Sequence, residues 1–240
     1  MIKTSNAEPH RQQVLPARYY STWRPSFDEL VKESLTRECA VLDVGAGCKP
    51  TFAPLQRSKK CYYAGLDLSA HELAKAPAGS YDDTWARDIT CHCPELEGRF
   101  DLVISWQVLE HVKPLETAIE NIRGYLRPGG RFVATLSGAF SAYGLINQVV
   151  PARLGVFAMY KLLGRDPQTV FPAYYDHCWQ TALERMLSDW KGFKVIPFYI
   201  GAGYFGFSRN LQKIYLRYED WALNRKHFNL ATHYLIEATK

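Results

Sequence analysis

The stretch from Val41 to Pro50 reads VLDVGAGCKP, and its first four residues are typical of a buried strand. That strand continues directly into Gly45-Ala46-Gly47. Closely spaced glycines permit a tight turn, because glycine adopts positive φ readily, and they let a ligand lie against the backbone. In an open parallel sheet, ligands bind outside the carboxyl ends of the strands. The stretch therefore predicts an α/β fold whose ligand site begins at this turn.

The residues after the turn argue against two common nucleotide-binding motifs. A dinucleotide fingerprint has a third glycine three positions after the second, and Pro50 occupies that position here. A P-loop needs Gly-Lys followed by Ser or Thr, and no such sequence follows Gly47. A nicotinamide-dependent oxidoreductase is therefore the less favoured alternative.

The same stretch resembles the first motif of class I S-adenosylmethionine-dependent methyltransferases, which usually reads (V/L)LD(V/L)GxGxG. Asp43, Gly45 and Gly47 match that pattern, whereas Lys49 departs from its last glycine. The resemblance implies an α/β, Rossmann-like, doubly wound sheet of seven mostly parallel strands with an antiparallel last strand. It also implies S-adenosylmethionine as the cofactor. It rests on motifs over residues 39–136 and on architecture alone elsewhere.

Composition limits the class of protein. Of the 240 residues, 47% are hydrophobic, which suffices for the core of one α/β domain. The net charge of +5 is spread without a basic block, so no nucleic-acid partner is expected. No run of about 18 apolar residues predicts a spanning helix, and no signal peptide is visible. The six cysteines lack disulfide-framework spacing. We therefore expect a cytoplasmic protein, with peripheral membrane contact as a further possibility.

Strand and helix patterns alternate along the chain and predict a single domain. Its expected parts are an N-terminal lid or helix (1–38), a cofactor-binding core (39–136), a helical cap insertion (137–172) and the rest of the sheet (173–240). Expected strands are Cys39–Val44, Cys61–Asp67, Trp85–Asp88, Phe100–Ser105, Arg131–Leu136, Gly192–Ile200 and Asn229–Ala238. Expected helices are Tyr19–Leu35, Pro114–Leu126, Ala142–Val150, Arg153–Leu163, Thr181–Trp190 and Arg209–Trp221, the last with Leu211, Ile214, Tyr215, Tyr218 and Ala222 inward.

The N-terminal helix carries two open questions. Ser26, with Glu29 three residues later, has the pattern of a capping box. The aromatic and basic residues around it either cover the sheet or fold over the ligand as a lid. These residues are Tyr19, Tyr20, Trp23 and Arg24.

Acidic residues end the expected strands. Asp67 stands 20 residues after Gly47, where such folds place an acid on the ribose hydroxyls; its structural alternative is a helix cap. The resemblance implies that Asp88 accepts from the adenine amino group while Ile89 packs on the ring, although Asp88 also suits a turn. Asp43 is expected to be buried and bonded to loop amides or water. The full expected cofactor set is Asp43, Gly45, Ala46, Gly47, Asp67, Leu68, Asp88, Ile89, Ser105, Trp106 and Gln107.

The segment Trp106-Gln107-Val108-Leu109-Glu110-His111 follows the fourth strand and resembles the Leu-Glu-His segment of small-molecule methyltransferases. In that family, residues here face the transferred methyl group. His111 is the expected base, with Glu110 and His177 as further catalytic candidates. The same three residues are a weak alternative metal site, because some relatives bind a divalent cation there. Cys91-His92-Cys93 lacks a partner pair at zinc spacing, so we interpret it as a loop.

These observations predict methyl transfer to a small-molecule, glycan or lipid-like acceptor, at oxygen. The motifs of DNA-base methyltransferases are absent from the sequence. A cofactor-binding protein without turnover is the alternative from another class. Segment 137–172, with Tyr143 and Phe157 among its aromatics, either caps an apolar acceptor pocket or simply covers the sheet.

Overall fold

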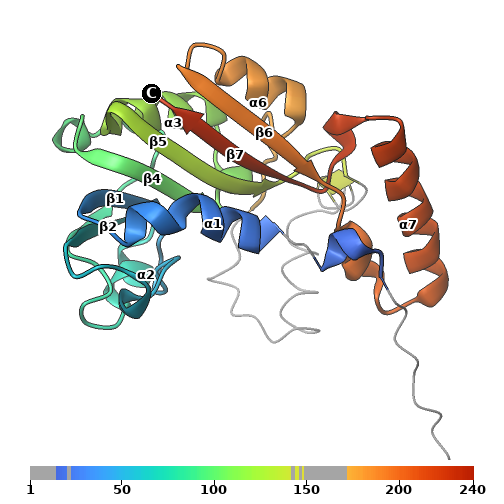
Figure 1. Cartoon of the computed structure of the whole chain (residues 1–240), viewed down its shortest axis with the longest axis horizontal. Helices are drawn as coiled ribbons and strands as arrows, with labels where there is room; N and C mark the ends of the chain where they lie inside the picture. Colours follow the sequence, from blue (N-terminus) through green and yellow to red (C-terminus); the bar gives the residue numbers. More distant parts are fainter. Residues whose placement is uncertain (1–14, 21–22, 142–143, 146–147, 149–171) are drawn as a thin grey trace, which may run out of the picture.

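The computed structural model describes residues 15–20, 23–141, 144–145, 148 and 172–240. Its centre is one seven-stranded sheet in the order β3-β2-β1-β4-β5-β7-β6 (Figure 1). The strands are β1 Cys39–Val44, β2 Cys61–Asp67, β3 Thr84–Ala86, β4 Phe100–Trp106, β5 Leu126–Ser137, β6 Gly192–Phe198 and β7 His233–Thr239.

Strands β1 to β5 pair in parallel, and β7 runs antiparallel to both of its neighbours. This arrangement confirms the predicted seven-stranded sheet with an antiparallel last strand. Because β7 is antiparallel, its first residue pairs with the last residue of β5, His233 beside Ser137. The start of β7 therefore lies at the same edge of the sheet as the carboxyl ends of the parallel strands.

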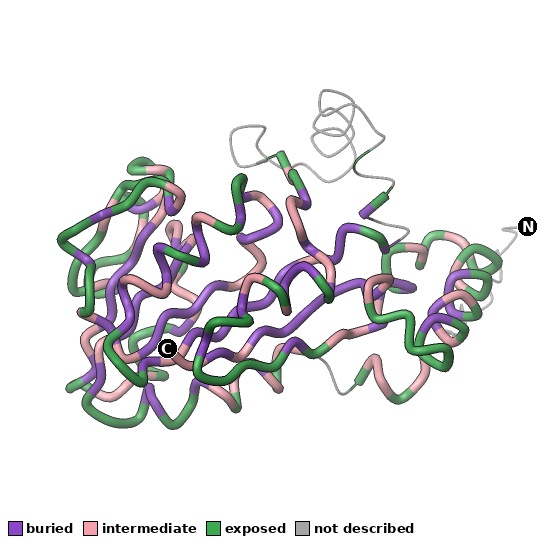
Figure 2. The backbone as a smooth tube through the Cα atoms, turned by 90° about the horizontal axis from the view of Figure 1, so that it is seen from above, coloured by how far each residue is buried: buried purple, intermediate pink, exposed green. Residues whose placement is uncertain are grey.

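Helices cover both faces of the sheet, as a doubly wound fold requires (Figure 1). The helices are α1 Trp23–Leu35, α2 Ala70–Ala74, α3 Leu115–Tyr125, α6 Gln180–Met186 and α7 Arg209–Asn224. On one face, α1 packs Phe27, Val31 and Leu35, spaced by one helical turn, onto the strands. On the other face, α3 and α6 pack onto the larger apolar cluster. Figure 2 shows the strands as the buried layer between exposed loops.

The apolar pattern of α3 is confirmed, since Leu115, Ala118, Ile119 and Ile122 are all buried. Other boundaries differ from the prediction. Helix α1 begins at Trp23, so Ser26 lies inside it and is not its N-cap. Strand β5 begins at Leu126, because the Pro-Gly-Gly stretch stays extended beside the end of β7.

The bounds of β3, β7 and α6 also differ from the sequence prediction. Strand β3 ends at Ala86, which leaves Asp88 in the following loop. Strand β7 begins at His233, because Phe228–Leu230 forms a 3₁₀ turn (η7) instead of extended chain. Helix α6 ends at Met186, short of the expected Trp190.

Helix α7 stands at the end of the molecule where β6 finishes (Figure 1). Ser208 caps it, and its buried residues are Tyr215, Leu216, Glu219 and Ala222. Leu211 and Ile214, predicted inward, are exposed. Among the described residues, no helix is long and apolar enough to cross a membrane. The expected helices Ala142–Val150 and Arg153–Leu163, with Tyr143 and Phe157, lie outside the described residues.

Candidate functional site

A cavity of about 700 Å³ opens at the carboxyl ends of β1, β2 and β4. We call it the strand-end cavity. Its wall includes most of the residues that the sequence singled out, namely Gly45, Ala46, Gly47, Asp67, Leu68, Asp88, Ile89, Trp106, Gln107 and His111. Asp43, Ser105, Glu110 and His177 are not part of that wall.

Glycines shape the turn that forms the floor of the cavity. Gly45 has φ +78°, and a Cβ there would lie 2.1 Å from Val108 Cγ2. The backbone amides of Gly45 and Ala46 both donate to the carbonyl of Leu66, at 2.7 and 3.2 Å. The turn is therefore fixed against β2, and only glycine fits its first position without displacing Val108.

Asp67 joins that turn to the end of β2. Its Oδ2 accepts from the Gly47 amide at 2.9 Å, and its Oδ1 accepts from the Ser69 amide at 2.8 Å. Burial raises the pKa of this carboxyl. The N-cap of α2 is Ser69, whose hydroxyl accepts from Glu72. Asp67 is thus an oriented carboxylate in the cavity wall and not a helix cap.

Asp88 and Ile89 form the part of the wall that follows β3. Asp88 is exposed, and its Oδ1 accepts from the amide and the hydroxyl of Thr90, at 2.9 and 2.8 Å. This is the turn that the sequence allowed as an alternative, and its two hydrogen bonds involve Oδ1 and not Oδ2. Ile89 is buried beside it. The pair offers a hydrogen-bond acceptor next to an apolar surface.

Asp43 and Ser105 lie beneath the cavity. Asp43 is fully buried and accepts from the Thr51 amide, the Thr51 hydroxyl and Tyr63 OH, at 2.8, 2.8 and 2.7 Å. Burial raises its pKa to about 6. Ser105 donates to the carbonyl of Val44 at 3.1 Å. Both residues therefore support the loop and the strands that shape the cavity.

Trp106 ends β4 and is clamped by the start of α1. Its ring stacks on Trp23 at 4.8 Å between centroids, and the Arg24 guanidinium lies 4.5 Å from its centroid. Tyr20 is exposed, whereas Tyr19 turns away to contact Glu219. Of the four residues considered as a lid, Trp23 and Arg24 therefore cover the strand end beside the cavity.

A buried polar chain continues from the cavity wall. Gln107, at φ 56°, has its side-chain amide nitrogen near Ser137 Oγ (3.0 Å) and Glu110 Oε1 (3.2 Å). Ser137 Oγ lies 3.4 Å from His233 Nδ1, and His233 Nε2 lies 3.4 Å from Tyr204 OH. Non-glycine residues at positive φ are costly and persist only where their surroundings hold them. The hydrogen bonds of this polar chain hold Gln107 in that conformation.

His233 is the member of this chain that the sequence analysis missed. It is 3% exposed, and burial lowers its pKa to about 4. Trp23 stacks on its ring at 4.3 Å. The signal that could have found it is the antiparallel pairing of the last strand, which brings that strand's first residue to the edge where β5 ends.

Glu110 stands behind the wall rather than in it. Its Oε1 accepts from the Ser137 amide at 3.3 Å, and its backbone carbonyl accepts from the amides of Tyr174 and Tyr175. Burial raises the pKa of its carboxyl, and within the described part of the chain Oε2 has no partner. Glu110 thus ties the 3₁₀ turn Leu109–His111 (η4) to β5 and to residues 174–175.

His111 lies in the cavity wall, and its Nδ1 is 3.0 Å from the carbonyl oxygen of Pro172. A carbonyl only accepts, so Nδ1 carries the proton and neutral His111 keeps its lone pair on Nε2. His177 instead pairs with Asp176 at 2.9 Å and stacks on Trp179.

The candidate metal ligands do not assemble. Within the described ranges, no group of three or more His, Cys, Asp or Glu side chains is placed to hold a metal ion. His92 pairs with Glu97, and Cys93 donates to Glu95. Neither Glu110, His111 and His177 nor the Cys91–Cys93 loop forms a ligand set in this structure.

A second hollow, of about 840 Å³, lies at the opposite edge, near the amino ends of β1 and β2. It contains none of the predicted site residues. Its arginines are largely engaged, Arg127 with Asp101 and Arg131 with Glu237, each at 2.8 Å. The larger volume of this hollow is no evidence of a functional site, so the strand-end cavity is the candidate site.

A family model described as a methyltransferase domain matches residues 17–195. The chain belongs to this methyltransferase family. The match includes α1, every residue that lines the strand-end cavity, and β1 to β5. It confirms the relationship to class I S-adenosylmethionine-dependent methyltransferases that the glycine turn and the segment after β4 indicated.

The matches to individual relatives cover only part of each relative's length. A malonyl-[acyl-carrier protein] O-methyltransferase of Enterobacter lignolyticus is 33% identical over 137 residues, 56% of this chain and 52% of that protein. A ubiquinone biosynthesis O-methyltransferase of Brucella melitensis is 32% identical over 109 residues, 43% of this chain and 44% of that protein. The matches thus span about half of those relatives.

A solved structure shows the same fold. Haemonchus contortus phosphoethanolamine N-methyltransferase 2, in complex with S-adenosyl-L-methionine, superposes with a TM-score of 0.55 at 15% identity. The superposition covers 91% of this chain and 52% of that one. At this identity, the likeness concerns the fold alone.

Proposed function

We propose that the protein binds S-adenosylmethionine in the strand-end cavity and transfers its methyl group to a hydroxyl of a small-molecule, glycan or lipid-like acceptor. The family membership supports the reaction, and the O-methyltransferase relatives favour oxygen over nitrogen or carbon. No acceptor is named by these observations.

The cavity fits the proposed cofactor in three places. Asp67 is held by two amides and offers a carboxylate for the ribose hydroxyls. Asp88 and Ile89 offer an acceptor and an apolar surface for the adenine. In the turn from Gly45 to Gly47, both glycines lack a Cβ, which favours a close approach of the methionine part to the backbone.

When bound, S-adenosylmethionine supplies an electrophilic methyl group; the protein's own task is to align the acceptor and to accept its proton. His111, which lines the cavity, is the proposed base, and one observation carries that proposal: its Nδ1 faces the Pro172 carbonyl, which leaves Nε2 as its basic nitrogen. Glu110 and His177, proposed from the sequence as further catalytic groups, fit supporting roles better, because neither lines the cavity.

The test compares His111→Asn with His177→Asn. An asparagine at 111 retains a donor for Pro172 but has no basic nitrogen. We expect methyl transfer from radiolabelled S-adenosylmethionine into fractions of a cell extract to fall roughly 10²–10⁴-fold in His111→Asn. Transfer should stay near normal in His177→Asn, and both variants should bind S-adenosylhomocysteine.

The two parts of this proposal fail separately. Absence of S-adenosylhomocysteine binding to the unmodified protein would refute the cofactor assignment. Normal binding and normal turnover in His111→Asn would refute only the role of His111.

A further inference from the structure

The end of the molecule that carries α7 exposes several large apolar side chains. Phe207 is 80% exposed and Ile214 61%, and Leu211 and Trp221 are also exposed. Leu211, Ile214 and Trp221 are three and seven residues apart, which places them on one side of α7, and Phe207 lies in the turn just before the N-cap Ser208. We call Phe207, Leu211, Ile214 and Trp221, with their cationic neighbours Lys213 and Arg217, the α7 surface.

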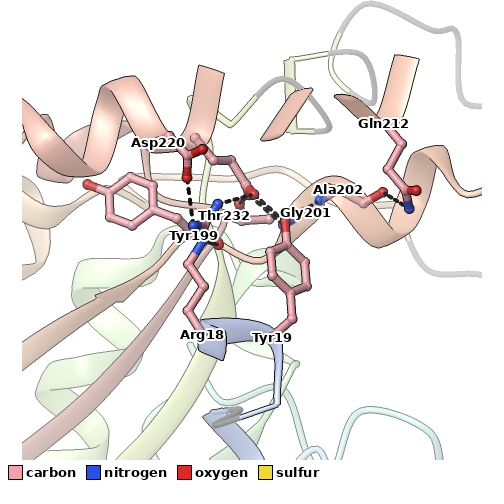
Figure 3. A network of polar contacts seen from close by, with 9 residues as sticks. Arg18, Tyr19, Tyr199, Gly201, Ala202, Gln212, Asp220 and Thr232 are labelled. Atoms are coloured by element: carbon pink, nitrogen blue, oxygen red, sulfur yellow. Dashed lines mark hydrogen bonds and ion pairs between the residues drawn. The ribbon is translucent and has the colours of Figure 1, made fainter. Parts of the chain in front are cut away.

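The opposite side of α7 is fixed to the domain, so the helix cannot rotate to bury these side chains. Glu219 is fully buried, and its Oε1 accepts from the Gly201 amide at 2.6 Å and from Thr232 Oγ1 at 3.0 Å. Tyr19 OH donates to its Oε2. Figure 3 shows these groups converging from the 3₁₀ turn Ala17–Tyr19 (η1), the 3₁₀ helix Gly201–Phe205 (η6) and the segment before β7.

The acidic and basic side chains of α7 differ in their partners. Its two acids are engaged toward the domain: Glu219 in that network, and Asp220 in an ion pair with Arg18 at 2.7 Å (Figure 3). Lys213 and Arg217 are exposed, and no acid among the described residues pairs with them. The outward side of the helix therefore combines apolar side chains with uncompensated positive charge.

This combination favours one occupant, a lipid surface with negative charge. Interfacial helices bury an apolar side at the headgroup boundary while their lysines and arginines meet anionic lipids. A second copy of the chain fits less well, because a two-fold contact brings the same patch together on both sides and would oppose like charges. We propose that the α7 surface binds the face of a bilayer that contains anionic lipid.

Membrane binding through the α7 surface would also orient the sheet relative to the bilayer. The α7 surface follows directly on η6, whose Tyr204 contacts His233 at the end of the buried polar chain. A protein held at a bilayer by α7 would keep near the membrane the edge of the sheet at which β5 and β6 end and β7 begins. The binding itself does not depend on the proposed methyl transfer.

The test is flotation of the full chain with vesicles of phosphatidylcholine alone, or of phosphatidylcholine with phosphatidylglycerol in equal parts. We expect binding to the anionic vesicles that decreases as salt rises. In Lys213→Gln/Arg217→Gln the partition coefficient should fall on the order of 30-fold, from about 1 kcal/mol for each basic residue. Phe207→Ser/Ile214→Ser should bind weakly at any salt concentration.

The matched control is Leu55→Ser/Lys59→Gln, which removes a fully exposed leucine and a lysine from a distant loop. It should bind like the unmodified protein, and thermal unfolding checks that every variant folds. Binding that is absent, equal for neutral vesicles, or unchanged in both α7 variants would overturn the proposal. So would a dimer, seen by sedimentation, that Phe207→Ser/Ile214→Ser abolishes while vesicles stay unbound.

Discussion

The turn at Gly45 allows steric clash and backbone strain to be separated by experiment. In Gly45→Ala, the new side chain would sit at φ +78° and 2.1 Å from Val108 Cγ2. Left-handed backbone costs an L-residue about 1–2 kcal/mol, and overpacking adds about 1–3 kcal/mol. We therefore expect Gly45→Ala to lower the free energy of unfolding by roughly 2–5 kcal/mol.

Gly79 supplies the matched control. It has φ +79°, nearly the same as Gly45, but a Cβ there would meet nothing within 4 Å. Gly79→Ala should therefore lose only the strain, about 1–2 kcal/mol. Urea unfolding measures both free energies, and thermal unfolding should show a drop of about 2–4 °C for each kcal/mol in a protein of this size.

Ligand binding gives a second readout of the same pair. Val108 lines the strand-end cavity, so its displacement in Gly45→Ala should also weaken S-adenosylhomocysteine binding, whereas Gly79→Ala should bind normally. Equal losses of stability in the two variants would refute the reasoning, because they would show that Val108 yields without cost and that only the backbone conformation matters.

Two further predictions concern single side chains. Asp67→Ala should weaken S-adenosylhomocysteine binding by roughly 1–3 kcal/mol, the range for hydrogen bonds to a charged group. Asp101→Ala also loses two hydrogen-bond partners but lies at the opposite edge of the sheet, so it should leave the affinity measured by calorimetry unchanged. Equal effects of the two substitutions would remove Asp67 from the site. Burial lowers the pKa of His233 to about 4, so between pH 6.5 and 4 the unfolded chain binds a proton that the folded protein does not, and stability falls as the pH falls. Between pH 7 and pH 4.5, the free energy of unfolding should fall by about 2–3 kcal/mol less in His233→Gln than in the unmodified protein, as measured by urea unfolding. Identical pH profiles of the two proteins would show that His233 is protonated in the folded state.

The succession of strands along the chain and the mostly parallel sheet that they form could be predicted well from the sequence, and the position of the cavity followed from them. Residues such as Gly45, Asp67 and Trp106 stand where a strand pattern ends, and parallel strands bring those ends to one edge. The prediction needed only local patterns and one rule of topology. That is why most of the expected cofactor residues line one cavity.

What could not be predicted depends on contacts between distant segments. His233 reaches the site only through the antiparallel register of β7 with β5. Helix α7 has apolar residues on two sides. The side that includes Tyr215 is buried, because the hydrogen bonds of Glu219 fix the rotation of the helix. Periodicity gives the face of a helix but not which of two apolar faces meets the core, so Leu211 and Ile214 were predicted inward and lie outward.

The insertion of β7 between β5 and β6 has a consequence for the folding pathway. Strand β6 precedes β7 in the chain, yet β7 is its neighbour in the sheet, so β6 cannot pair with the parallel strands when it is synthesised. Until β7 arrives, β5 presents an open edge, and open edges invite pairing with other chains. Completion of the sheet requires pairing between residues 131–137 and 233–239, a separation that slows folding. A refolding intermediate that lacks β6 and β7 should therefore aggregate more readily than the native protein.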